Sequence, residues 1–155
     1  MPVREPYDYP PQARALTEPE YQAVVHYVAG LLRWLRLDHW VVGVDRTPVQ
    51  NPNSSAEVST APESCRATIS LCPEWAAMRP EAQVAALIHE VLHLLSTEAD
   101  RVARQHLSHE MHAEYRQHVE VAVDHLSWVL AEGRPEVMVD PYADGSPGYV
   151  EDRGV

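Results

Sequence analysis

The sequence predicts an α+β domain, and three observations predict it. Residues 18–36 and 107–131 repeat apolar residues at helical spacing. Residues 66–71 alternate between polar and apolar side chains and include β-branched residues, which favours a strand. Residues 81–97 are apolar almost all round and contain neither Gly nor Pro, which predicts a buried helix. We therefore expect an N-terminal helix, a small, mostly antiparallel sheet, a buried central helix and a second long helix.

Composition limits the number of domains and the class of partner. A chain of 155 residues with 45% hydrophobic residues can form one domain with a substantial core. A formal net charge of -11, without any Lys, argues against nucleic acid and anionic membranes as partners. No basic region followed by an apolar block opens the sequence, so we expect a cytoplasmic location. Cys65 and Cys72 are expected to be reduced, structural thiols.

The chain divides into three parts by composition. Residues 1–16 are rich in Pro and predict an extended arm. Residues 17–132 form the predicted domain, and residues 133–155 predict an acidic, flexible tail.

The first elements of the domain have recognisable boundaries. Thr17 to Glu20 form a capping box that begins the first helix. Strands are predicted at residues 40–45, 56–60 and 66–71, and the Pro- and Asn-rich segment 47–55 predicts a loop. Pro80 and Glu81 suit the first turn of the central helix, which either ends in a connection after Thr97 or extends beyond it.

The central helix contains a motif with a specific chemistry. His89-Glu90-Val91-Leu92-His93 is His-Glu-x-x-His, which on a helix places two imidazoles one turn apart on the same face. Neutral imidazoles at this spacing can bind Zn²⁺, and the intervening Glu90 can take a proton from a water on the metal. Unpaired polar residues are costly inside an apolar helix, so their presence favours a metal site over a metal-free helical domain.

A catalytic zinc ion needs a third protein ligand. The metzincin pattern would place Gly at Ser96 and His at Ala99, so that source is excluded. The remaining source is the helix over residues 107–131, with an expected inner stripe of Leu107, Met111, Tyr115, Val119, Ala122, Leu126, Val129 and Leu130. Helical phase leaves Glu114, His118 and Glu120 open as ligands.

With these residues, the chain resembles the gluzincin branch of zinc metallopeptidases over roughly residues 65–131. In that family a ligand Glu follows on a later helix, and four residues on an Asp hydrogen-bonds a zinc-bound imidazole; Glu120-Val-Ala-Val-Asp124 is similar. The chain also resembles small zincin-like proteins of bacteriophages. The resemblance implies a zincin-like fold, Glu120 as third ligand and Asp124 as its supporting carboxylate. It also implies an oxyanion donor, for which the candidates are His106, His109, His112, Tyr115 and His125.

Two functions follow from this motif. The first is a zinc-dependent metallopeptidase, a hydrolase that cleaves a peptide or protein substrate by a zinc-bound water with Glu90 as general base. Residues 66–71 are then the expected edge strand for the extended peptide. The alternative is a non-catalytic structural or assembly protein of a phage particle that uses zinc as a staple, in a virion rather than a host cytoplasm. Glu90 favours the peptidase, because a structural site does not need it.

Overall fold

The computed structural model describes residues 15–45 and 54–135, and it confirms the α+β class. In chain order the elements are α1 (Glu18–Trp34), β1 (Val41–Asp45), β2 (Ala56–Ala61), β3 (Arg66–Leu71), α2 (Pro80–His106) and α3 (His109–Ala131). Short 3-10 helices lie at Pro62–Ser64 and Trp75–Ala77. The predicted N-terminal arm, the 47–55 loop and the acidic tail fall almost entirely outside the described residues.

Helix α1 begins at the predicted capping box. The Thr17 hydroxyl accepts a hydrogen bond from the Glu20 N–H at 3.3 Å, and the Glu20 carboxylate accepts one from the Thr17 N–H at 3.1 Å. Two of the helix's otherwise unpaired donors are thereby satisfied. One side of α1 is apolar and buried. Its residues are Ala23, Val24, Tyr27, Val28, Leu31 and Leu32.

The sheet is mixed, which corrects the expectation of a mostly antiparallel one. Its strand order is β1-β3-β2, with β2 antiparallel and β1 parallel to the central β3. The short 3-10 turn after β2 allows β2 and β3 to form an antiparallel pair. Strand β1 then occupies the remaining edge of β3, in register so that Val44 and Val58 both lie opposite Ile69.

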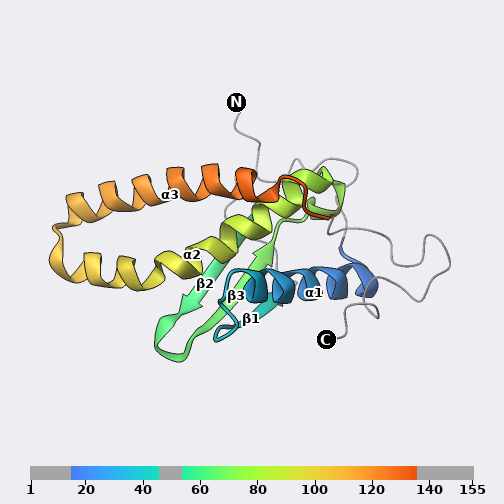
Figure 1. Cartoon of the computed structure of the whole chain (residues 1–155), viewed down its shortest axis with the longest axis horizontal. Helices are drawn as coiled ribbons and strands as arrows, with labels where there is room; N and C mark the ends of the chain where they lie inside the picture. Colours follow the sequence, from blue (N-terminus) through green and yellow to red (C-terminus); the bar gives the residue numbers. More distant parts are fainter. Residues whose placement is uncertain (1–14, 46–53, 136–155) are drawn as a thin grey trace.

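One face of the sheet carries the core. Ala67, Ile69 and Leu71 of β3 are buried, whereas the alternate residues Arg66 and Thr68 are exposed. Helix α1 contacts β1 and helix α2 contacts β2 on the buried side. Helix α3 packs mainly on α2, and α2 lies between the sheet and α3 (Figure 1).

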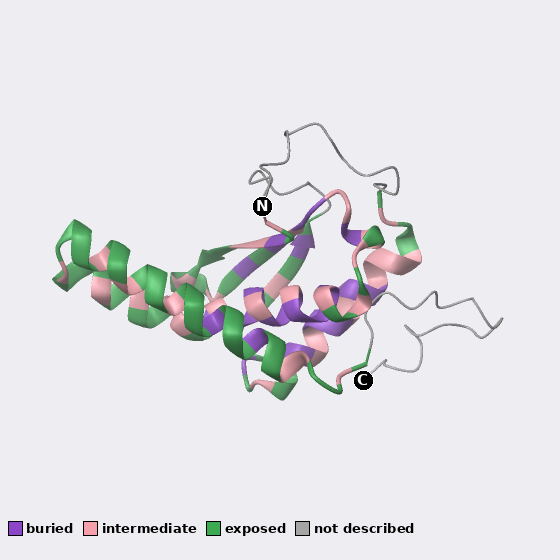
Figure 2. Cartoon of the chain, turned by 90° about the horizontal axis from the view of Figure 1, so that it is seen from above, coloured by how far each residue is buried: buried purple, intermediate pink, exposed green. Residues whose placement is uncertain are grey.

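Helix α2 extends beyond Thr97 as far as His106, so of the two alternatives for the residues after Thr97 the helix extension is the correct one. The end of α2 and the start of α3 project past the sheet as a helical arm (Figures 1 and 2). The arm is largely exposed (Figure 2). Leu95, which was expected in the core, is exposed, whereas its neighbour Leu94 is buried. None of the helices in the described part of the chain has the length and apolarity needed for a bilayer crossing.

The inner stripe predicted for α3 is partly wrong. Met111, Leu126 and Val129 are exposed, and the buried residues of α3 are Val123 and Ser127. Apolar residues occur on more than one side of this helix, so its periodicity alone does not identify the side that contacts α2. The observed orientation turns Glu120 and Asp124 toward α2.

Candidate metal centre

The two motif histidines lie on α2, on the side that faces α3. Their Nε2 atoms are 3.1 Å apart, and their rings meet edge to face with centroids separated by 4.9 Å. The two side chains are 19% and 20% exposed, and both line an open cavity. One helical turn separates His89 from His93, as the sequence predicts.

Glu120 of α3 completes a group of three possible metal ligands. Its Oε2 lies 3.3 Å from His89 Nε2, and its Oε1 lies 3.1 Å from His93 Nε2. Ligand atoms held about 2.0–2.1 Å from a tetrahedral zinc ion are separated by roughly 3.3 Å. Each imidazole Nε2 has about this spacing from one oxygen of the Glu120 carboxylate, a different oxygen for each ring, and one ligand atom from each of the three residues lies within 4.8 Å of the other two.

The other two candidates for the third ligand lie elsewhere. Glu114 and His118 are exposed and are 3.7 Å from each other, at i and i+4 on α3. Their side chains thus face solvent and not the two imidazoles. Of the three alternatives that helical phase left open, the structure brings only Glu120 to the motif.

Asp124 lies one turn after Glu120, on the same side of α3. Its Oδ1 is 3.7 Å from His89 Nδ1, within the range of an ion pair but longer than a hydrogen bond. A carboxylate on this side favours the tautomer that carries its proton on Nδ1 and leaves Nε2 free for a metal. The resemblance implies a hydrogen bond between this carboxylate and the imidazole; the two groups are close together, but at a distance longer than that bond.

Glu90 is a buried carboxylate beside the three ligand residues. Burial and, to a smaller extent, the nearby Glu120 charge together raise the pKa of Glu90 to about 8, and a hydrogen bond from the Val58 backbone opposes this shift. A cation between the three ligands would favour the charged form and lower this pKa. Glu90 thus has a place next to the proposed metal without belonging to the ligand group.

The electrostatics of His93 also suit metal binding. Burial lowers the pKa of His93, with smaller effects from His89 and Arg116 in the same direction and an opposing effect from Glu120. The neutral imidazole is therefore favoured at neutral pH, and it is the form that coordinates metals.

A cavity of about 510 Å³ opens on these residues, between β2, α2 and α3. We name it the cleft. Ala56, Glu57, Val58 and Thr60 of β2 line it, because β2 is an edge strand whose free side faces α2. The expectation that β3 is the edge strand is wrong, since β1 and β2 occupy both of its edges.

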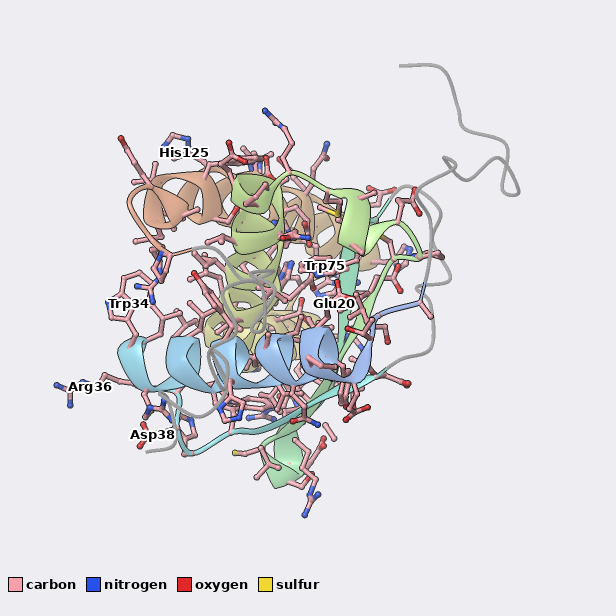
Figure 3. All side chains as sticks on the ribbon, turned by 90° about the vertical axis from the view of Figure 1, so that its right-hand side faces the viewer. Glu20, Trp34, Arg36, Asp38, Trp75 and His125 are labelled. Atoms are coloured by element: carbon pink, nitrogen blue, oxygen red, sulfur yellow. The ribbon has the colours of Figure 1, made fainter. Side chains whose placement is uncertain are left out.

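The cleft contains one of the five predicted oxyanion donors, Tyr115. His112 Nε2 is instead 2.9 Å from Asp100 Oδ1. His106 and His109 do not line the cleft, and His125 projects from the outer side of α3 (Figure 3).

Arg116 lines the cleft beside Tyr115 and was missed in the sequence. It lies four residues before Glu120, so helical spacing places both on one face of α3. That spacing could have identified Arg116 once Glu120 was taken as a ligand.

Comparison with protein-family models, with curated proteins and with solved structures finds no match to this chain.

Proposed function

We propose that this chain is a zinc-dependent metallopeptidase with a zincin-like fold, in which His89, His93 and Glu120 bind Zn²⁺. The observation that supports the proposal is the grouping of His89, His93 and Glu120, in which each imidazole Nε2 lies 3.1–3.3 Å from one oxygen of the Glu120 carboxylate and 3.1 Å from the other Nε2, with the Glu90 carboxylate beside them. Two His and one Glu are a ligand set of catalytic zinc sites, which leave a position open. The open side here is the cleft.

In the proposed peptide hydrolysis, the residues around the metal centre have different roles. A bound zinc ion would polarise the scissile carbonyl and acidify the attacking water. Glu90 accepts the proton of that water and passes it to the leaving amine. Tyr115 and Arg116 carry hydrogen-bond donors into the same cleft, where negative charge develops on the carbonyl oxygen.

The edge strand β2 supplies a surface for an extended peptide. The Val58 backbone N–H is close enough to Glu90 to act as its hydrogen-bond donor. This N–H is therefore directed toward the cleft. Unpaired N–H and C=O groups on an edge strand can pair with a further strand. We therefore propose that the substrate main chain lies along β2.

We propose a cytoplasmic location for this protein, or a location in the virion if a phage encodes it. Its support is that Cys65 and Cys72 are free thiols, as is typical of reducing compartments.

The experiment compares the parent protein with Glu90→Gln on a diverse peptide library, with cleavage products identified by mass spectrometry. We expect cleavage by the parent, its loss on adding a chelator, and a rate about 10²- to 10⁴-fold lower in Glu90→Gln with zinc content unchanged. Glu98→Gln is the matched control, since Glu98 is an exposed carboxylate of α2 that pairs with Arg101.

Two outcomes would contradict the mechanism. Equal cleavage by parent and Glu90→Gln would exclude Glu90 as the base. A zinc-loaded parent that cleaves no peptide, and whose stability depends on zinc, would favour the structural staple.

A further inference from the structure

A surface hollow of about 530 Å³ runs along the second half of α3. It lies on the outer side of the helix, from which His125 projects (Figure 3). Val123 and Ser127, the buried residues of α3, lie on the opposite side by helical spacing. We name this hollow the outer groove. The residues that line it are Val121, Asp124, His125, Trp128, Val129 and Glu132.

The wall of the outer groove is mostly apolar, although it lies at the surface. Val121, Trp128 and Val129 are 47–67% exposed. Their spacing of seven and eight residues places them on one face of α3, over a length of about 12 Å. An exposed apolar patch that contains a Trp and has polar groups at its rim is typical of a protein-binding surface.

The charged side chains beside this patch are carboxylates. Asp124 and Glu132 line the outer groove, and the half-exposed Glu120 lies one turn before Asp124. The sequence has no Lys or Arg between Arg116 and Arg134. The groove therefore combines an apolar wall with negative charge, and a partner with apolar and basic side chains is complementary to it.

Two other occupants are less compatible with this charge. In a two-fold dimer, the same surface of a second copy would cover the groove, so the carboxylates of both copies would lie close together. Juxtaposed like charges are unfavourable. Residues 136–155 follow α3 in the sequence, but they include more acidic than basic side chains. The charge thus favours a different, basic protein over a second copy or this segment.

We propose that the outer groove binds a basic amphipathic helix of another protein. Its apolar side chains contact Trp128 and the two valines, and its Lys or Arg side chains pair with Asp124 and Glu132. A helix suits this surface because the side chains of one helix pack between those of another. The inference does not rest on the proposed peptidase function, since neither Glu90 nor the three proposed metal ligands line the groove.

The probe is a peptide of about 14 residues, or four helical turns, made of Leu and Lys with Leu at helical spacing. Two control peptides have the same length. In one, Glu replaces every Lys; in the other, Leu and Lys are reordered so that no apolar face forms. Fluorescence anisotropy with labelled peptides measures Kd for the full-length protein. We expect the amphipathic Lys peptide to bind with a Kd at least about tenfold below that of either control. Mass spectrometry after each titration verifies that the peptide is intact.

The Trp at the centre of the patch is tested by a matched pair of variants. Trp128→Ala should raise the Kd of the amphipathic Lys peptide about tenfold or more, because a large aromatic side chain is a typical hot spot of an interface. Trp34→Ala is the control, since Trp34 is 43% exposed, against 47% for Trp128, and lies on α1 with its ring against Arg134. We expect its Kd to stay close to that of the parent.

A second pair of variants tests the charge and the location. Glu132→Lys should raise the Kd, and Glu98→Lys should raise it less, because it makes the same change in net charge on α2, outside the groove. With ¹⁵N-labelled Trp, the peptide should shift the indole N–H signal of Trp128, which Trp128→Phe assigns. The signal of Trp34 should not change.

Three results would overturn the proposal. An equal Kd for the amphipathic and the reordered Lys peptides would show that net charge alone attracts them. A Trp128 signal that does not shift at saturation would place the bound peptide elsewhere. A dimer of the parent that Trp128→Ala dissociates, as measured by analytical ultracentrifugation, would identify a second copy as the occupant.

Discussion

Glu120 is the residue that distinguishes a metal centre from two neighbouring imidazoles. His89 and His93 by themselves offer two imidazole nitrogens, 3.1 Å apart; the Glu120 carboxylate adds one oxygen at 3.3 Å from His89 and another at 3.1 Å from His93. The carboxylate is 52% exposed, so burial against apolar neighbours does not explain its orientation. Its position next to two imidazoles is the main reason to assign it a role.

We expect Glu120→Gln to lower zinc affinity strongly, because an amide oxygen is a weaker ligand than a carboxylate and carries no charge. Isothermal titration or competition with a chromophoric chelator measures the change. Glu114→Gln is the matched control, since Glu114 lies on the same helix and faces solvent. Equal loss in both variants would show that the net charge of α3 matters and not the ligand.

Asp124→Asn should lower zinc affinity by about 10- to 100-fold, since the carboxylate favours the His89 tautomer with a free Nε2. Glu132→Gln, an exposed carboxylate of the same charge just beyond α3, should have no such effect. An unchanged zinc affinity in Asp124→Asn, measured by the same competition, would contradict the role of Asp124 in supporting His89.

The sequence predicts the local part of this site and not the long-range part. His89, Glu90 and His93 could be found because five consecutive residues on one helix determine their relation. Glu120 lies on another helix, and the phase of α3 was misjudged because apolar residues such as Met111 and Val129 occur on its exposed side. Only the spacing of Glu120 and Asp124, through a family resemblance, indicated the correct face.

At the scale of elements, helix and strand positions were predictable and strand order was not. Residues 66–71 are the strand that the alternation predicts, yet this strand is central and β2 is the edge next to the metal centre. Each strand's pattern reports which of its faces is buried, and not which neighbours it has. Which strand forms the edge that could bind a peptide therefore depends on the strand order of the whole sheet, and the residues of one strand do not determine it.

The orientation of β2 leads to a prediction with proline substitutions. The Val58 N–H points toward the cleft, and by alternation the Ser59 N–H points toward β3. Val58→Pro would place its ring in the cleft, whereas Ser59→Pro would place it against β3 and remove a ladder hydrogen bond. We expect Ser59→Pro to lower the melting temperature more, as measured by circular dichroism. The reverse order would contradict the edge assignment of β2.

At the scale of the whole molecule, the metal centre joins α3 to the rest of the fold. Helix α3 buries only Val123 and Ser127 fully, and it contacts the sheet through α2. A metal held by His89 and His93 of α2 and Glu120 of α3 would add a strong link between the two helices. Ligand binding to the folded state alone stabilises it, by about 2.7 kcal/mol at a concentration 100 times Kd.

Removal of the metal should therefore loosen α3 selectively. We expect a chelator to lower the melting temperature and to accelerate amide hydrogen exchange in α3, while exchange in α1 changes little because α1 packs on the sheet and α2 through its own apolar face. Hydrogen exchange with mass spectrometry compares the two helices in one sample. Equal acceleration in α1 and α3 would indicate global destabilisation instead.

The amount of zinc in the purified protein tests the central claim most directly. We predict about one zinc ion per chain by elemental analysis after purification without chelator, or after incubation with zinc and dialysis. His93→Ala should lose this zinc, because two ligands remain where three are needed. A parent protein that contains no transition metal and takes up none on adding zinc would contradict the account.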